Sequence, residues 1–289
     1  CIKGLRRSLA RLYAFRRSTR NPIRAKKIYR GRCMQNAGNT LNHHEITALR
    51  FVEVTKYHGP HRILDRLDFA VQKNEFFGLV GVNGAGKSTC IKALLDFCET
   101  DAGDMEIFGH PHREIQARAC LSFLPEQFLP PYYLTGMDFL RYMANLHGRP
   151  YRDKDVYNIL NSLDLNRASL AKPVRQHSKG MAQKLGLAAC FLSGKPLLVL
   201  DEPLSGLDPK ARLLVKRHLT GLRLAKTHTL FFSTHLLSDV EELCDRLGIL
   251  HEGRLRFIGT PEQCRGYYGT NTLEDAFFRC ISQSEHDGK

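Results

Sequence analysis

The segment from Gly81 to Thr89, G-V-N-G-A-G-K-S-T, has the residue types and the spacing needed to hold phosphate. It follows the apolar run Phe76–Val80 and opens a helix-compatible stretch, Thr89–Phe97, so it fits G-x-x-x-x-G-K-[ST] in a strand, loop, helix setting. The glycines leave the backbone bare, so N–H groups and the helix N-terminus can surround a phosphate. Lys87 would reach the β- and γ-phosphates, and the Ser88 hydroxyl would bind Mg²⁺. The predicted nucleotide-binding residues are Gly81, Asn83, Gly84, Ala85, Gly86, Lys87, Ser88 and Thr89.

Two acids close another apolar run. Pro196–Leu200 is typical of a buried strand, and Asp201 and Glu202 follow it directly. Beside a phosphate loop the first carboxylate can hold Mg²⁺, usually through water, because a cation that bridges the β- and γ-phosphates neutralises charge as their bond breaks. The second carboxylate can orient and deprotonate the attacking water. The pair therefore predicts hydrolysis, with Asp201 as a metal ligand and Glu202 as the general base.

A second anion-binding loop is predicted 23 residues before Asp201, where Ser178-Lys179-Gly180-Met181 opens a helix. This loop resembles the signature loop of the nucleotide-binding subunits of ABC transporters. It has the form S-K-G-M in place of the commoner S-G-G-Q. The S-K-G-M form is similar to the signature loop of bacterial exporter-type subunits. The resemblance implies that Ser178 and Gly180 contact the γ-phosphate.

Four further positions fall in the order that this family shows. Tyr57, 24 residues before Gly81, is similar to the aromatic residue that stacks on adenine. Gln127 resembles the glutamine that contacts Mg²⁺ and the lytic water. The Ser205–Asp208 segment resembles the loop that crosses a dimer interface, with Asp208 near the nucleotide, and His235 resembles the switch histidine. A single glutamine or histidine is more often structural, so the resemblance depends on the whole ordered set.

The resemblance implies a subunit that binds and hydrolyses ATP with Mg²⁺. Two copies would bind head to tail, each ATP lying between the first loop of one copy and the Ser178 loop of the other. Hydrolysis would remove the γ-phosphate bridge and let this homodimer open. The implied catalytic residues are Glu202, His235, Lys87 and Gln127, and the implied Mg²⁺ residues are Ser88, Gln127 and Asp201.

The family resemblance also implies partners. A separate transmembrane permease would be coupled through the surface around Gln127 and the following helical insert, which places the protein in the cytoplasm, peripheral on the inner face of the cell membrane. The segment Leu273-Glu274-Asp275-Ala276-Phe277, together with S-K-G-M, favours an exporter. The transported substrate leaves no trace in the sequence.

Three alternatives stay open. A soluble ABC-type ATPase acting on ribosomes or DNA would usually show two fused domains or a long heptad-bearing insertion, and the sequence shows neither. An ordinary P-loop kinase or GTPase would lack the Ser178 loop, and no N-K-x-D motif is present. A regulatory, non-hydrolysing subunit is the third alternative, although every hydrolytic position is intact.

The elements that must position these residues are of two kinds. From Leu49 the apolar residues alternate and predict short, half-exposed antiparallel strands that break at His58-Gly59-Pro60. From Phe76 short buried runs alternate with amphipathic segments, which predicts a parallel sheet covered on both faces. The predicted fold class is therefore α/β, a P-loop NTPase core with a mainly parallel sheet, an antiparallel β-subdomain and a helical insert. The predicted buried strands are Phe76–Val80, Cys120–Leu124, Pro196–Leu200, Thr229–Phe232 and Leu247–Leu250.

The resulting domain prediction has three parts. Residues 46–259 form the ABC-type domain, with the helical insert at about 125–180. Residues 260–289 form a short helical extension, which begins at the helix start Thr260-Pro261-Glu262-Gln263. Residues 1–33 form a basic leader. No apolar run approaches the 18 residues that predict a membrane span.

The charge is concentrated in the leader. Residues 1–33 contribute twelve of the 43 basic residues and no acid, which leaves 31 basic and 29 acidic side chains for residues 34–289. The net charge of +14 is therefore no argument for nucleic-acid binding. Because Met34 stands where the composition changes, we interpret the leader as unstructured or as sequence upstream of a true start. A targeting segment and an arm for anionic lipid or nucleic acid are alternatives.

The cysteines and histidines predict no resident metal site. Nine scattered cysteines without a C-x-x-C pair are typical of reduced thiols in a cytosolic protein. The pairs His43-His44 and His110/His112 lack partners at ligand spacing, so we interpret them as surface polar residues.

Overall fold

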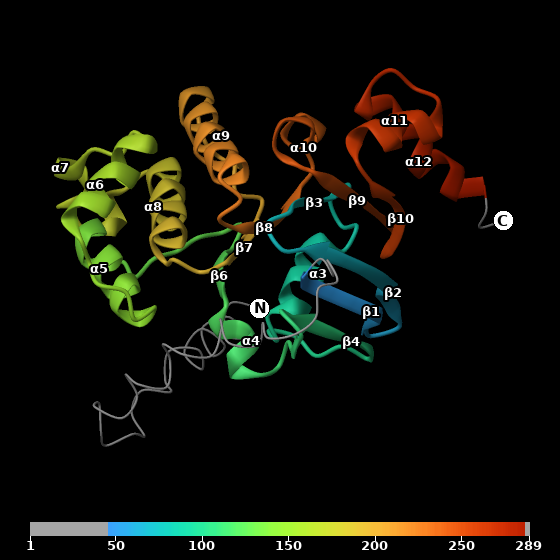
Figure 1. Ribbon diagram of the computed structural model, residues 1–289, viewed down its shortest axis with the longest axis horizontal. Helices are drawn as coiled ribbons and strands as arrows, with labels where there is room; N and C mark the ends of the chain where they lie inside the picture. The colour runs from blue at the N-terminus through green and yellow to red at the C-terminus, as the bar shows by residue number, and fades with distance from the viewer. Residues whose placement is uncertain (1–45, 287–289) are drawn as a thin grey trace, which may run out of the picture. The chain divides into compact units, whose positions relative to one another are not determined.

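The computed structural model describes residues 46–286, and a six-stranded sheet lies at the centre of this part of the chain (Figure 1). The strand order is β10-β9-β3-β8-β7-β6, and all neighbours pair in parallel except β10, which is antiparallel to β9. Every residue of β3, β7 and β8 is buried, as expected of parallel strands that are covered on both faces. The strands are β3 (Phe76–Val80), β6 (Leu121–Leu124), β7 (Leu197–Asp201), β8 (Thr229–Thr234), β9 (Arg246–His251) and β10 (Arg254–Gly259).

The two faces of the sheet are packed against different layers. Phe76 and Val80 point into a core shared with the helices α5, α6, α8, α9 and α10. Phe77 and Leu79 point the other way, into a core shared with α3 and the antiparallel strands. The helices are α3 (Lys87–Leu94), α4 (Ile115–Ala119), α5 (Gly136–Leu146), α6 (Asp153–Ser162), α7 (Arg167–Leu170), α8 (Lys179–Leu192), α9 (Pro209–Leu224), α10 (Leu237–Leu243), α11 (Pro261–Tyr268) and α12 (Leu273–His286), with a 3₁₀ turn, η2 (Val174–Gln176).

The second sheet is antiparallel, with the order β2-β1-β4-β5. Its strands are β1 (Thr47–His58), β2 (His61–Gln72), β4 (Ala102–Ile107) and β5 (His110–Pro111). The sequence predicts short strands here, but β1 and β2 each span 12 residues. Glu53 and Arg66 both have φ of 49°, and the β1–β2 register shifts between Phe51 and Val54. These bulges interrupt the apolar alternation inside continuous strands, which explains the difference.

The region between β6 and β7 is helical, as the loss of strand pattern after residue 125 predicts. α5 and α6 both pack on α8, and Leu140, Leu160 and Leu185 share one core there. α8 begins at Lys179, directly after Ser178, so the packing of this helical layer positions the Ser178 loop.

After β10 the chain forms α11 and α12. The helix start predicted at Thr260 is a full capping box: Gln263 N donates to Thr260 Oγ1 at 3.1 Å, and Thr260 N donates to Gln263 Oε1 at 2.8 Å. No helix within residues 46–286 is long and apolar enough to cross a membrane.

Two sequence-based interpretations have different outcomes in the structure. The prediction that His112 is a surface residue is wrong, because its side chain is buried and its Nδ1 lies 3.1 Å from Met105 O. His110 is exposed in β5. The basic leader 1–33 and the His43-His44 pair lie outside the described residues.

The predicted fold class is confirmed: a mainly parallel α/β core, an antiparallel β-subdomain and a helical insert.

Candidate functional site

The Gly81–Thr89 loop joins the end of β3 to the start of α3, at the carboxyl edge of the parallel sheet. Gly81 is required by a close backbone approach, because a Cβ at this position would lie 2.3 Å from Leu250 O. Gly86 has φ of 109°, and a Cβ there would lie 2.8 Å from Ile63 O. No side chain fits at either position, so both must be glycine. The backbone N–H groups of the loop are therefore left uncovered, which favours phosphate binding.

Lys87 is buried inside this loop, with a relative exposure of 7%. Its Nζ donates to Gly81 O at 2.7 Å and to Val82 O at 3.1 Å, and it lies 3.8 Å from Glu202 Oε1. Burial lowers the pKa of Lys87, while the negative charges of Glu202 and Asp201 oppose that shift. The loop carbonyls therefore hold an ammonium group next to the two carboxylates, where it can meet phosphate oxygens.

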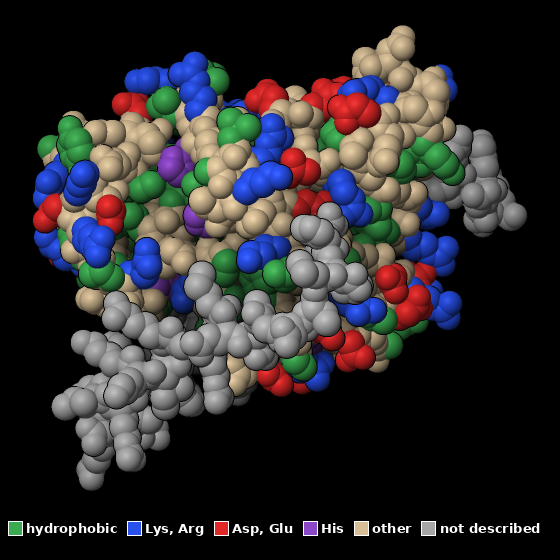
Figure 2. Space-filling model, in the orientation of Figure 1, with side chains coloured by type: hydrophobic (Ala, Val, Ile, Leu, Met, Phe, Trp, Pro, Cys, Tyr) green, Lys and Arg blue, Asp and Glu red, His purple; other side chains and the backbone are tan. Residues whose placement is uncertain are grey.

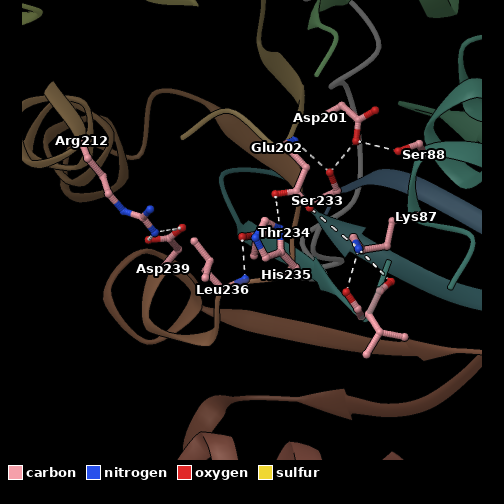
Figure 3. A network of polar contacts seen from close by, with 12 residues as sticks. Lys87, Ser88, Asp201, Glu202, Arg212, Ser233, Thr234, His235, Leu236 and Asp239 are labelled. Carbon is pink, nitrogen blue, oxygen red and sulfur yellow. Dashed lines mark hydrogen bonds and ion pairs between the residues drawn. The ribbon is translucent and has the colours of Figure 1, made fainter. Parts of the chain in front are cut away.

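A hydroxyl and a carboxylate converge beside the lysine (Figure 3). Ser88 Oγ donates to Asp201 Oδ1 at 3.2 Å, and Ser233 Oγ donates to the same oxygen at 2.6 Å. Ser233 Oγ also accepts from Glu202 N at 3.0 Å. The β7–β8 register creates this contact, because Asp201 and Ser233 are paired positions. Ser233 thus fixes both the Asp201 carboxylate and the backbone of Glu202.

Ser88 and Asp201 fit a Mg²⁺ ion. Both are hard oxygen donors, and Mg²⁺ in nucleotide sites is held by one or two protein oxygens while phosphates and waters complete its coordination. No cluster of three or more His, Cys, Asp or Glu side chains within residues 46–286 could hold a metal ion by itself. Ser88 and Asp201 offer the one or two protein oxygens that Mg²⁺ takes in a nucleotide site.

Glu202 and His235 form the second polar contact of the site. His235 Nδ1 lies 2.9 Å from Glu202 Oε2, and the Glu202 side chain is 10% exposed while that of His235 is 44% exposed. Glu202 has φ of 48°, in the left-handed region. A non-glycine residue there costs about 1 kcal/mol, and such strain is common at functional sites. The carboxylate is thus held between Lys87 and His235.

The structure brings together five of the predicted residues: Lys87, Ser88, Asp201, Glu202 and His235. Asn83 and Gly84 are exposed on the loop, Ala85 and Gly86 are buried, and Thr89 is half-buried in α3.

The other predicted residues lie on different elements. Ser178 caps α8, accepting from Met181 N at 3.2 Å, and Asp208 caps α9, accepting from Ala211 N at 2.9 Å. Gln127 is exposed after β6. The Tyr57 ring is exposed and lies 5.5 Å from the Arg62 guanidinium carbon. None of the hydrogen bonds found among the described residues joins Ser178, Asp208, Gln127 or Tyr57 to the Gly81–Thr89 loop.

Sequence reasoning missed three polar residues that support the site. Ser233 stands two residues before His235 at the end of a strand, a position that could have been noticed. Gln183 in α8 is buried and donates from Nε2 to Pro203 O at 3.1 Å, next to Glu202. Asp239 in α10 is 1% exposed and pairs with Arg212. Asp239 lies on a helix without any motif around it, whereas Gln183 lies two residues after the Ser178–Met181 loop, whose pattern assigns it no role.

Comparisons with known proteins identify the family. The family model described as "ABC transporter" matches residues 64–205. An uncharacterized ABC transporter ATP-binding protein of Synechocystis sp. is 36% identical over 206 residues, which cover 70% of this chain and 58% of that protein. The bacitracin transport ATP-binding protein BcrA of Bacillus licheniformis is 34% identical over 215 residues, which cover 72% of this chain and 68% of that protein.

A solved structure described as the ATP-binding subunit of an ABC transporter superposes with a TM-score of 0.74 at 29% identity, and the match covers 81% of this chain and 99% of that one. The chain belongs to the ATP-binding proteins of ABC transporters. The resemblance seen in the sequence is thereby confirmed. The matches span about three-fifths of the length of the first curated relatives, 58%, 60% and 64%.

Proposed function

We propose that this chain binds ATP with Mg²⁺ and hydrolyses it to drive transport across a membrane. The observation that carries the proposal is the convergence of Lys87, Ser88, Asp201 and Glu202 at one edge of the sheet. Mg²⁺ would supply charge neutralisation between the β- and γ-phosphates. Lys87 binds the same phosphates, and Ser88 and Asp201 offer the oxygens that hold the cation, with Gln127 joining them.

Glu202 acts as the general base. Its carboxylate is nearly buried and lies between the Lys87 ammonium and the His235 ring. From there it can take a proton from the water that attacks the γ-phosphate. His235 Nδ1 holds Glu202 Oε2 at 2.9 Å, which leaves the other ring nitrogen for the phosphate. Tyr57 stacks on the adenine.

The complete site needs a second copy of the chain. Ser178 and Gly180 stand at the N-terminus of α8, a helix of 14 residues, where N–H groups and the helix dipole attract an anion. None of the hydrogen bonds found for them among residues 46–286 of one copy reaches the Gly81–Thr89 loop. We place them, together with Asp208, against the ATP bound by the opposite copy of a head-to-tail homodimer.

A transmembrane permease is the proposed partner. Three large apolar residues follow Gln127 on one exposed segment: Leu129, Tyr132 and Tyr133 are 86%, 67% and 69% exposed. Exposed apolar groups clustered in this way mark contact surfaces more often than scattered ones. The name of BcrA refers to bacitracin transport. Other similar proteins, from Sinorhizobium fredii among others, are named Nod factor export ATP-binding protein I, which supports export by this chain too. The protein would then lie in the cytoplasm at the inner face of the cell membrane, with its permease on a separate chain.

The test is a pull-down from native membranes with the tagged Glu202→Gln protein in the presence of ATP and Mg²⁺. We expect a multi-span membrane protein among the partners found by mass spectrometry, and its loss with Leu129→Ser/Tyr132→Ser/Tyr133→Ser. Recovery of ribosomal or DNA-associated proteins alone would overturn the transport function and favour the soluble ATPase alternative. Figure 2 shows acidic and basic side chains interspersed on the visible face, which does not favour a nucleic-acid partner.

A further inference from the structure

A buried ionic cluster joins α9 to α10 close to the site (Figure 3). Arg212 Nη2 lies 2.6 Å from each carboxylate oxygen of Asp239, and Lys216 Nζ lies 3.0 Å from Asp239 Oδ1. Lys216 also pairs with Glu242 at 2.9 Å. The side chain of Asp239 is 2% exposed, while those of Arg212 and Lys216 are 27% and 11% exposed. Two cations thus compensate one fully buried carboxylate.

The cluster connects the two segments that leave the catalytic edge of the sheet. Arg212 lies one turn into α9, and its N–H donates to Asp208 O at 2.9 Å, so it moves with the loop that follows Glu202. Asp239 lies in the first turn of α10, and its N–H donates to Leu236 O at 3.2 Å, one residue after His235. Leu236 N in turn donates to Thr234 Oγ1 at 3.0 Å.

This arrangement ties His235 to the Glu202 side of the site by a second route. The direct route is the 2.9 Å contact between the two side chains, and His235 is too exposed for packing to fix its ring. The indirect route runs through α10, Asp239, Arg212 and the start of α9. The Asp239 carboxylate and its two cations hold α9 and α10 together firmly, because loss of one ion pair would leave a buried charge without full compensation.

We propose that Asp239 is a positioning residue for ATP hydrolysis, which acts through Arg212 to hold His235 against Glu202. The inference rests on the proposed function for its kinetic consequence. Displacing a reacting group by about 1 Å can cost about 100-fold in rate. Asp239→Asn is therefore expected to lower kcat between about 10-fold and 100-fold while KM for ATP changes by less than about threefold.

The decisive experiment is a double-mutant cycle with His235→Ala. If Asp239 acts through His235, Asp239→Asn lowers kcat in the wild-type background but by less than about twofold in the His235→Ala background. Arg212→Lys keeps the charge, but its shorter side chain lacks the Nη2 that contacts both Asp239 oxygens. It should therefore lower kcat in the same way as Asp239→Asn, with less effect on folding. Equal loss of kcat in both backgrounds would overturn the proposal, since Asp239 would then act independently of His235.

A second measurement does not depend on hydrolysis. The ring ¹⁵N signal of His235 reports the contact of Nδ1 with Glu202, and it can be assigned by its loss in His235→Ala. We expect the signal to shift in Asp239→Asn and Arg212→Lys. An unchanged signal would overturn the proposal even if the protein did not hydrolyse ATP. Absent ATP turnover with a shifted signal would instead overturn the proposed function alone.

The chain offers a matched control on the same helix. Glu241 in α10 pairs with Arg265 of α11 through Oε1 and Nη1 at 2.8 Å, on the side away from α9. Glu241→Gln removes an ion pair from α10 without touching Asp239. It should leave kcat and the His235 signal as in the wild type.

Discussion

At the scale of single residues, each buried charge of the site is held in place by only a few atoms. Lys87 donates two hydrogen bonds to the carbonyls of its own loop, and Glu202 lies between Lys87 and His235. The environment of each group is therefore set by one or two neighbours. A substitution of Lys87 should therefore weaken ATP binding, and a substitution of Glu202 should slow hydrolysis.

Lys87→Ala tests the phosphate contact. Charge-assisted hydrogen bonds contribute about 1.5–3 kcal/mol, so the affinity for ATP should fall about 10-fold to 100-fold. The measurement is a titration with a fluorescent ATP analogue. Lys92→Ala is the matched control, because Lys92 lies exposed on the same helix α3. Equal affinity of Lys87→Ala and the wild type would contradict the role of the loop.

Glu202→Gln tests the general base. The amide keeps the shape of the side chain but cannot take a proton, so turnover should fall between about 100-fold and 10,000-fold. ATP binding should persist, and ATP with Mg²⁺ should produce a dimer on gel filtration. A variant that remains monomeric and turns over ATP normally would show that another group removes the proton.

At the scale of elements, two helices that flank the sheet each contain a glycine, and the two glycines differ in their surroundings. Gly186 lies in α8, where a Cβ would approach Leu124 Cδ1 at 2.5 Å and Phe128 Cδ1 at 2.9 Å. Gly221 lies exposed in α9, and nothing lies within 4 Å of a Cβ there. The first glycine is required by packing against the sheet, whereas the second only lowers the helix propensity.

Alanine substitutions at these two glycines should therefore have opposite effects. Gly221→Ala should raise the free energy of unfolding by about 0.5–1 kcal/mol, because alanine loses less backbone entropy in a helix. Gly186→Ala should lower it by about 1–3 kcal/mol, because the core around Leu124 would be overpacked. Urea unfolding followed by circular dichroism measures both, and the same sign for both variants would contradict the packing of α8.

At the scale of the whole molecule, the proposed dimer places each ATP between two different loops of two copies. A C2 dimer of this kind has two equivalent sites, each made from the Gly81–Thr89 loop of one copy and the Ser178 loop of the other. Damage to either loop would break both sites of a homodimer. A mixture of two damaged chains would contain a heterodimer with one intact site.

Mixing Lys87→Ala and Ser178→Arg, both in the Glu202→Gln background, tests this arrangement. Neither variant alone should retain ATP after gel filtration. The mixture should retain about one ATP per heterodimer, since its one intact site combines the undamaged loops of both chains. The measurement is the ATP that co-elutes with the dimer. Retention of ATP by the Ser178→Arg chain alone would show that Ser178 does not complete the site.

The sequence by itself determined the local chemistry of this protein. The glycine spacing around Lys87 and the acids after Pro196–Leu200 depend on a few consecutive residues, so their pattern predicts the phosphate loop and the strand end. Buried runs alternating with helices likewise predict the mainly parallel sheet, because such strands need both faces covered. The family resemblance arose from the order of these local motifs, and the comparisons confirm it.

Only the tertiary structure decided which distant residues meet. Ser233 contacts Asp201 because β7 and β8 pair in one register, and Asp239 meets Arg212 because α9 and α10 leave neighbouring strands. The need for Gly81 comes from Leu250 O, 169 positions further along the chain. Register and helix packing are set by the summed burial of the whole core, which no short pattern of residues records.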